Sequence, residues 1–175
     1  YHVLTRGIEN GKKVDTQLKV ESISRALIAQ KDWAKILELS KSPDLKYVIS
    51  NVTEVGLALD PNDRHTENAP SSFPAKLLLI LKTRFEAQQS GLTILPCELV
   101  DRNGDLLLDL IVQQAQQWEL DHGLQNLLRQ ENTWCNCLVD RIVSGLPERH
   151  PLLEQDKLLT AAEPYALWAI ESPNG

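Results

Sequence analysis

The sequence predicts an α/β protein in which helices cover a parallel sheet. Short, continuously apolar runs alternate with longer segments whose apolar residues recur every three or four positions. Such runs are typical of strands buried on both faces of a parallel sheet, and such segments are typical of amphipathic helices. Strands that alternate with helices pair in parallel, because the helix carries the chain back across the sheet.

The first twenty residues depart from this pattern and predict a β-hairpin. Residues 1–7 and 14–20 alternate apolar and polar side chains, as strands with one exposed face do. Between them stands Asn10-Gly11, a dipeptide that suits the left-handed backbone of a tight turn.

The stretch after the hairpin predicts two helical segments and a strand. Ser22 can cap a short helix that runs through Leu27, and residues 33–39 carry a helical period that Pro43 ends. The apolar run 46–51 finishes in polar residues, which predicts a buried strand that delivers side chains to a site.

The middle of the chain predicts a loop, a helix and a second strand. Residues 57–72 are rich in Pro, Asn, Asp and Ser, and we expect them to form a loop over the site. A long helix is predicted over residues 75–89, with Pro74 at its start and Gly91 as its C-cap. Residues 92–96 then read as a buried strand.

The last third of the chain predicts two more helices and a strand. A turn at Asn103-Gly104 leads into a helix over residues 106–120, and another helix is expected around 124–131. The tail is predicted as loop until an apolar strand at residues 165–170.

Composition and charge narrow the classes of function. The chain has 175 residues, of which 42% are hydrophobic and 24% are charged, as expected of a globular domain with a real core. A net charge of −6 argues against broad nucleic-acid binding, although a few local cations can still serve an anionic small substrate. No apolar run approaches the ~20 residues of a membrane-spanning helix, and no signal peptide is visible. We therefore expect a cytoplasmic protein that binds neither nucleic acid nor membranes.

The three cysteines predict buried thiols. Cys97, Cys135 and Cys137 are too few and too unevenly placed for a disulfide framework. The pair at positions 135 and 137 lacks a second ligand pair at zinc-site spacing, so we expect no metal.

Polar side chains gather where predicted strands or turns end, and in parallel sheets this is where ligands bind. Each cluster also has an ordinary explanation, as a helix cap or as a surface ion pair. Taken together they are candidates for one crevice. The clusters are Asn51-Val52-Thr53-Glu54, Cys97-Glu98-Leu99 and Val139-Asp140-Arg141.

Six stretches form a specific set when they are taken in order: Ser50 to Glu54, Ser72 to Leu77, Gly91 to Glu98, Asn103-Gly104, Asn132 to Val143, and Glu163 to Ile170. In this order and spacing they resemble the long-chain mannitol dehydrogenase family of polyol and sugar-acid dehydrogenases. The resemblance covers nearly the whole chain. It implies a Rossmann-like parallel sheet with helices on both faces, an NAD cofactor and hydride transfer.

The resemblance also implies an incomplete fold. The family's first βαβ unit, with its glycine-rich pyrophosphate turn, would precede Tyr1, since the glycines of this chain are isolated. The family's catalytic lysine and helical domain would follow Gly175, and the absence of Met at position 1 also suggests an excised piece. We therefore expect residues 1–170 to form a partial NAD-binding Rossmann domain, residues 171–175 to begin a linker, and the chain alone to be inactive.

The resemblance assigns cofactor contacts to several residues. Asn51, Thr53 and Glu54 match the strand end that faces the nicotinamide, and Val139 matches a position beside it. Lys76 matches a residue at a helix start, where a cation would meet phosphate or a carboxylate. A solvated helix lysine is an equally good interpretation of Lys76.

The substrate side of the match centres on Asp140, which we expect to accept hydrogen bonds from substrate hydroxyls or to orient the family's lysine. Glu98, Leu99 and Arg141 are the other candidate substrate contacts. Leu99 departs from the family, because mannitol-type members carry there an Asn that polarises the reacting carbonyl. Leucine cannot donate a hydrogen bond, so another group does this, or Glu98 is arranged differently for a sugar acid.

Two further stretches, Leu4 to Gly7 and Leu92 to Asp101, most resemble the members that interconvert tagaturonate and altronate. The implied substrate is a small sugar acid or polyol. Fructuronate and mannitol remain alternative substrates within the family, and a non-catalytic Rossmann-like binding module is the alternative outside it. We also expect the chain to self-associate through apolar faces left exposed at its ends.

Overall fold

The computed structural model describes residues 1–53 and 56–172. The chain divides into two compact units. Unit 1 comprises residues 1–26 and 139–168, and unit 2 comprises residues 27–138 and 169–175. The sequence alone does not predict this division, because unit 1 joins two segments that lie far apart in the chain.

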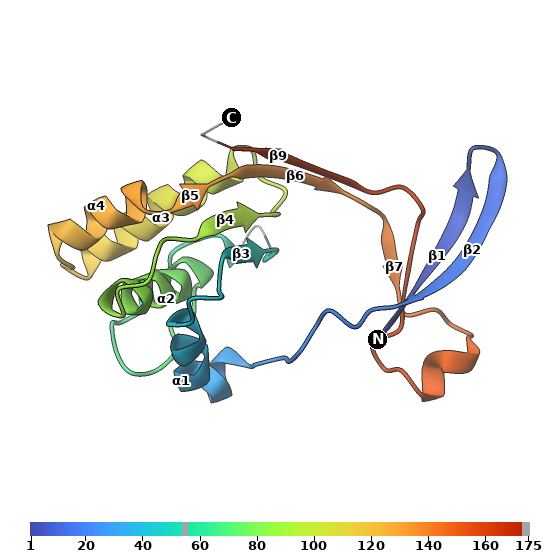
Figure 1. The fold of residues 1–175 in the computed structure, drawn as a ribbon, viewed down its shortest axis with the longest axis horizontal. Coiled ribbons are helices and arrows are strands. Elements are labelled where there is room, and N and C mark those ends of the chain that lie inside the picture. Colours follow the sequence, from blue (N-terminus) through green and yellow to red (C-terminus); the bar gives the residue numbers. More distant parts are fainter. Residues whose placement is uncertain (54–55, 173–175) are drawn as a thin grey trace. The chain divides into compact units, whose positions relative to one another are not determined.

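Unit 2 is an α/β unit with a parallel sheet (Figure 1). Its strands stand in the order β3-β4-β5, and both pairings are parallel. The alternation of strands and helices confirms the predicted fold class. The elements are α1 (Ala29–Ser40), β3 (Tyr47–Ser50), α2 (Phe73–Glu86), β4 (Thr93–Pro96), α3 (Asn103–Gln117), α4 (His122–Gln130) and β5 (Thr133–Trp134).

The boundaries of α2 follow from its caps. Ser72 precedes the helix, and its Oγ accepts a hydrogen bond from the amide of Ala75, which would otherwise lack a partner. The helix ends before Gln88, which adopts the left-handed backbone with φ 55°. The predicted C-cap at Gly91 is therefore wrong. Gly91 is needed for packing instead, because an added Cβ would lie 1.6 Å from the carbonyl oxygen of Glu131.

The short helix predicted between Ser22 and Leu27 is also wrong. Residues 20–28 contain no regular element, and most of them are exposed. A segment of this length has no packed face to offset the cost of starting a helix, so its capping residue alone does not fold it.

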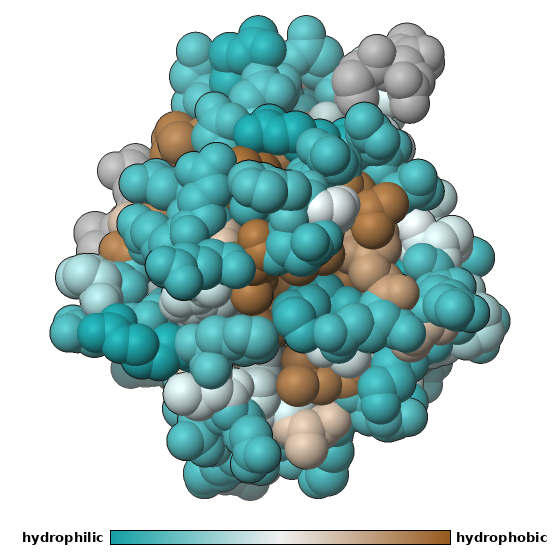
Figure 2. Space-filling model, turned by 90° about the vertical axis from the view of Figure 1, so that its left-hand side faces the viewer, coloured by the Kyte–Doolittle hydropathy of each residue, from teal (hydrophilic) through white to brown (hydrophobic). Residues whose placement is uncertain are grey.

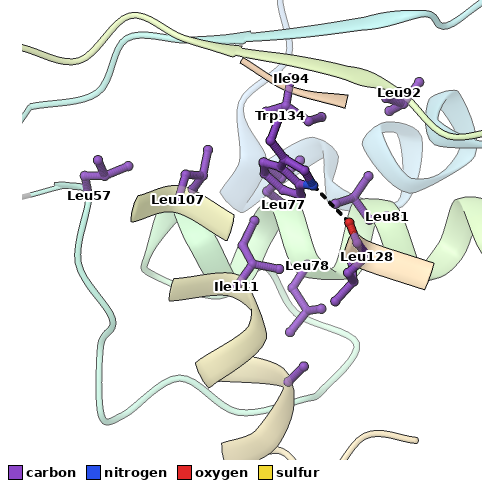
Figure 3. Packing of buried hydrophobic residues seen from close by; sticks show 11 residues of the cluster. Leu57, Leu77, Leu78, Leu81, Leu92, Ile94, Leu107, Ile111, Leu128 and Trp134 are labelled. Atoms are coloured by element: carbon purple, nitrogen blue, oxygen red, sulfur yellow. Dashed lines mark hydrogen bonds between the residues drawn. The ribbon is translucent and has the colours of Figure 1, made fainter. Parts of the chain in front are cut away.

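The core of unit 2 lies between the sheet and α2, α3 and α4 (Figure 3). Leu77 and Leu81 of α2 pack with Leu107 and Ile111 of α3, and all four are buried. Each such side chain contributes about 1.5–3 kcal/mol by leaving water. The indole of Trp134 is also buried here and donates a hydrogen bond to the carbonyl oxygen of Leu128 at 2.9 Å (Figure 3).

Arg84 of α2 is a buried cation that satisfies backbone carbonyls. Its guanidinium donates to the carbonyl oxygens of Ser40, Ser42, Leu45 and Ser90 at 2.6–3.0 Å. These bonds tie the end of α1 and the segment before β3 to the end of α2.

Unit 1 is built on a mixed sheet in the order β2-β1-β8-β7. β1 and β2 pair in antiparallel fashion around Asn10 and Gly11, which both have positive φ, so the predicted hairpin is confirmed. β8 pairs in parallel with β1 and antiparallel with β7. The elements are β1 (His2–Glu9), β2 (Lys12–Lys19), β7 (Val143–Gly145), the 3₁₀ helix η2 (Pro151–Glu154) and β8 (Thr160–Ala162).

A two-stranded sheet joins β6 (Asn136–Asp140) and β9 (Leu167–Glu171). The chain passes from unit 2 to unit 1 within β6 and returns within β9. The predicted apolar strand near the end of the chain corresponds to β9.

Hydrophilic residues cover most of the face in Figure 2, and hydrophobic atoms emerge between them. Over residues 1–53 and 56–172, no helix has the length and apolar character needed to cross a membrane.

Candidate functional site

The carboxyl ends of β3, β4 and β5 meet at one edge of the parallel sheet in unit 2, and we call this the polar edge. It begins after Ser50, Pro96 and Trp134, where the three strands end. Its polar side chains come from the last residue of β3, from the segments that follow the strands, and from the start of α3. They are Ser50, Asn51, Glu98, Asn103 and Asn136.

Glu98 links the ends of β3 and β4 at the polar edge. Its side chain is buried, with a relative exposure of 3% for the residue. One carboxylate oxygen accepts a hydrogen bond from Oγ of Ser50 at 3.1 Å, and the other accepts one from the amide of Val52 at 3.0 Å. A buried carboxylate is tolerated only when its oxygens are satisfied, so these bonds fix both strand ends. The predicted substrate contact thus has a structural role, and its contact with substrate stays a prediction.

Asn103, the first residue of α3, joins β4 to β6. It is fully buried, and its Nδ2 donates to the carbonyl oxygens of Glu98 at 2.9 Å and Cys137 at 2.8 Å. Its Oδ1 accepts from the amide of Cys137 at 2.9 Å. One side chain therefore makes three hydrogen bonds to backbone groups that the sheet leaves unpaired.

Asn136 caps α3 from another element. Its Oδ1 accepts from the amides of Gly104 at 3.0 Å and Asp105 at 3.2 Å, and its Nδ2 donates to the carboxylate of Glu171 at 3.0 Å. The helix packs so closely that a Cβ added to Gly104 would lie 2.2 Å from the carbonyl oxygen of Cys135. Only glycine fits this approach of helix to strand.

Sequence reasoning missed Asn103 and Asn136 as organisers of the site. Asn103 reads as a turn residue because it stands before Gly104. The available signal was an asparagine at the start of a helical period, where such side chains serve as caps.

A hollow of about 580 Å³ opens at the polar edge, and we call it the edge hollow. Its volume falls in the range of about 300–1,000 Å³ that small-molecule sites occupy. Leu99 lines it and is 71% exposed, so the leucine that departs from the family pattern faces open space. Its lining also includes Glu98, Arg102, Asn136, Cys137 and Leu138.

Two predicted cofactor contacts follow β3. Asn51 is exposed, and so is Thr53, whose Oγ1 accepts from the amide of Gly56 at 3.3 Å. Both offer polar atoms at the strand end, and their contact with a cofactor stays a prediction. Glu54 lies outside the described residues.

Lys76 lines a different hollow of about 490 Å³, together with Val52, Gly56, Asp60 and Ser72. We call this the loop hollow. The Nζ of Lys76 donates to the carbonyl oxygen of Ser71 at 2.5 Å. Lys76 therefore lines a hollow with the segment after β3, as the cofactor prediction requires, but its ammonium already has a backbone partner.

Asp63 holds the segment in front of α2. Its carboxylate accepts from the hydroxyl and amide of Ser72 at 2.6 and 2.9 Å, and from the amide of Ser71 at 2.5 Å. Burial alone would raise the pKa of Asp63, but these hydrogen bonds and the charge of Lys76 outweigh it and lower that pKa below its ordinary value. Asp63 is thus ionised and fixes the loop that borders the loop hollow.

Val139, Asp140 and Arg141 belong to unit 1. The carboxylate of Asp140 is exposed at the end of β6. Arg141 donates through Nε and Nη2 to the carbonyl oxygen of Glu163 at 3.1 and 3.0 Å. These two bonds hold the guanidinium in place and leave other N–H groups of its fork for a ligand.

Cys97 lies behind the polar edge as a buried thiol, as predicted. Burial, with the neighbouring Cys137 and Glu98, raises the pKa of Cys97 to about 11. Cys97 is therefore protonated at neutral pH and is a poor nucleophile for catalysis.

The sequence pattern of the family described as "Mannitol dehydrogenase Rossmann domain" matches residues 2–175. Among curated proteins, the chain is 42% identical to the altronate oxidoreductase of Halalkalibacterium halodurans, over 98% of the chain. It is 35% identical to that of Bacillus subtilis, over 99% of the chain.

The fold also resembles solved structures of polyol dehydrogenases. A D-sorbitol dehydrogenase in substrate-free form matches with a TM-score of 0.75 at 20% identity. The mannitol 2-dehydrogenase of Pseudomonas fluorescens, solved as a ternary complex with NAD and D-mannitol, matches with a TM-score of 0.76 at 18% identity. Both cover the whole chain, and at these identities they establish the Rossmann-like fold alone.

The chain spans only part of each of these proteins. It covers 35% and 38% of the two altronate oxidoreductases, and 40% and 39% of the two dehydrogenases of known structure.

Proposed function

The chain belongs to the mannitol dehydrogenase family, as its Rossmann domain, and on this premise we propose that it serves an NAD-dependent oxidoreductase that interconverts tagaturonate and altronate. The observation that carries the proposal is the polar edge, where Glu98 and Asn103 fix the strand ends beside an open hollow. Ligands of parallel α/β sheets bind at this edge. The choice of substrate rests on identities of 35–42% to altronate oxidoreductases along nearly the whole chain.

The donor set fits the nicotinamide end of a dinucleotide. Asn51 and Thr53 present an exposed amide and hydroxyl after β3, and such groups suit a carboxamide and a ribose. We propose that these residues, with Glu54 and Val139, hold that end, and that Lys76 meets a phosphate. The glycines of this chain are isolated, so we assign it no pyrophosphate turn. When bound, the cofactor supplies the hydride.

The chain's own contribution to the reaction is to position substrate and proton. We propose that the exposed carboxylate of Asp140 accepts hydrogen bonds from substrate hydroxyls or orients the group that transfers the proton. Arg141 would pair with the carboxylate of a sugar acid, since part of its fork is still available. Glu98 and Leu99 would shape the substrate side of the edge hollow.

The first test is NADH oxidation by the full-length protein that carries this chain, with tagaturonate, fructuronate and fructose at matched concentrations. We expect tagaturonate to be reduced fastest. A preference for fructose or fructuronate would keep the family and overturn the proposed substrate. No oxidation of NADH with any of the three would favour a non-catalytic binding module.

We also propose a cytoplasmic location, which suits an enzyme that draws on the NAD pool. Exposed apolar side chains, among them Leu99, Leu138 and Ile170, support self-association of the chain when it is studied alone. Monomeric elution at high concentration would contradict self-association.

A further inference from the structure

Two of the three cysteines lie close together at the polar edge. β4 and β5 pair in parallel with Thr93 opposite Thr133 and Ile94 opposite Trp134, and the amide of Cys135 donates to the carbonyl oxygen of Ile94 at 3.0 Å. Cys97 and Cys137 follow in the segments that leave this ladder. There the amide of Cys137 donates to Oδ1 of Asn103 at 2.9 Å instead of to a strand carbonyl.

Side-chain contacts join the two residues. The side chains of Cys97 and Cys137 share a hydrogen bond, and Nδ2 of Asn103 donates to the carbonyl oxygens of both Glu98 and Cys137. The two thiols therefore already touch, which is the first requirement for a disulfide between them. The thiol of Cys135 instead hydrogen-bonds to Ser172.

A reagent can reach one member of the pair. Cys137 lines the edge hollow, although the residue is only 8% exposed. Cys97 is 6% exposed and is not among the residues that line the hollow. Among residues 1–53 and 56–172, no cluster of three or more metal-binding side chains occurs.

We propose that Cys97 and Cys137 form a peroxide-sensitive thiol pair that closes to a disulfide between the end of β4 and β6. Cys137 first gives up its proton, and its thiolate attacks hydrogen peroxide, so that an S–O bond forms and the O–O bond breaks; the departing hydroxide takes up that proton and leaves as water. The thiolate of Cys97 then attacks the sulfenic sulfur, so that an S–S bond forms and the S–O bond breaks; the departing hydroxide takes up the proton that Cys97 lost and leaves as a second water. Two thiols are oxidised and one peroxide is reduced.

Formation of the disulfide does not depend on the proposed dehydrogenase reaction, although Cys137 lines the edge hollow. The disulfide would link covalently the two segments that Asn103 links by hydrogen bonds. Because the high pKa of Cys97 keeps its thiolate scarce, we expect closure to be slow at neutral pH. The pair would respond to sustained oxidation, and a thiol reductant would reopen it.

The test treats the reduced full-length protein with hydrogen peroxide, blocks remaining thiols with N-ethylmaleimide, digests it and maps the peptides by mass spectrometry. The expected product is a Cys97–Cys137 linked peptide pair that is lighter by about 2 Da, the mass of two hydrogens, and that dithiothreitol separates. Cys135 should remain a thiol that the reagent labels after denaturation.

Matched variants make the result specific. Cys97→Ala and Cys137→Ala should each abolish the linked pair, whereas Cys135→Ala should retain it. The peptide map of the oxidised wild-type protein tests the proposal even if one variant fails to fold. The proposal is overturned if Cys97 and Cys137 stay unlinked under peroxide, if Cys137 is linked to Cys135, or if each thiol is oxidised separately to sulfinic acid.

Discussion

The carboxylate of Glu98 accepts a hydrogen bond from the hydroxyl of Ser50 at 3.1 Å, across the ends of two neighbouring strands. The other carboxylate oxygen of Glu98 accepts a hydrogen bond from the amide of Val52. This buried side chain therefore holds the start of the segment that carries Asn51 and Thr53. Any change that removes one acceptor leaves a donor without a partner away from water.

We expect Glu98→Gln to lower the free energy of unfolding by about 1–3 kcal/mol, because an amide has only one acceptor oxygen for the two donors. Urea unfolding of both proteins measures the difference. Glu38→Gln, at an exposed position of α1, serves as the control and should change stability by less than about 0.5 kcal/mol. Equal losses in the free energy of unfolding for the two variants would contradict the role of Glu98 in holding the strand ends.

Asn103 should tolerate substitution even less. Asn103→Asp keeps the acceptor for the amide of Cys137 but turns a carboxylate toward the carbonyl oxygens of Glu98 and Cys137. We expect a loss of about 3 kcal/mol or more in the free energy of unfolding, since two donated bonds are replaced by repulsion. The control is Asn68→Asp in an exposed loop. A stable Asn103→Asp protein would show that the segments are held by other contacts.

The contrast between these residues shows what the sequence can predict. Apolar periodicity predicted β3, β4 and the helix α2 that stands between them, because burial in a parallel sheet imposes that pattern on neighbouring residues. The partner of Asn103 lies 34 residues away in β6, and no local pattern records such a contact. The local sequence also did not predict that α2 ends before Gln88, which adopts the left-handed backbone, and not at Gly91 as expected.

The candidate site, too, was predicted from the sequence only in part. The strand-end clusters were found because parallel topology places strand ends together. Sequence reasoning did not anticipate that Glu98 would be buried, because that depends on Ser50 and Val52. Nor did it anticipate unit 1, since the parallel pairing of β1 with β8 joins segments more than a hundred residues apart.

The lowered pKa of Asp63 predicts that the loop before α2 becomes less stable in acid. Its folded pKa is lowered, so its stabilisation is fully present above the unfolded pKa of about 3.9 and is lost as pH falls through the folded pKa. Asp63→Asn should lower the free energy of unfolding by about 2 kcal/mol at neutral pH, because three hydrogen bonds lose their charged acceptor.

The measurement is the free energy of unfolding between neutral pH and pH 3. The difference between wild type and Asp63→Asn should shrink as the pH falls. Asp44→Asn, at an exposed position, should not reproduce this dependence. A difference that stays constant with pH would show that Asp63 acts through packing and not through its charge.

If Asp140 positions substrate or proton, Asp140→Asn in the full-length protein should lower kcat/KM for tagaturonate by about 100-fold. The amide keeps the size of the side chain but loses the charge. The steady-state rates are compared with those of Asp109→Asn, a control at an exposed position of α3. Unchanged kinetics for Asp140→Asn would remove this residue from the proposed site.

Leu99 tests the substrate assignment most directly. The residue is 71% exposed, so a polar substitution there should cost less than about 0.5 kcal/mol in folding. If a donor at this position polarises the carbonyl of a neutral ketose, Leu99→Asn should raise the ratio of kcat/KM for fructose to that for tagaturonate by about tenfold. This is less than the ~100- to 1,000-fold effect of a single preorganised donor to a reacting oxygen, because the introduced side chain is not preorganised.

Leu99→Ala is the matched control, because it removes the leucine without adding a donor. A rise in the ratio with Asn alone would mean that hydrogen bonding at this position separates the two substrates. The same rise with Ala would mean that the bulk of leucine excludes fructose from the edge hollow. No change with either variant would place the choice of substrate elsewhere, and Arg141 would then be the first residue to test, since its guanidinium is already held by Glu163 and can pair with a sugar-acid carboxylate.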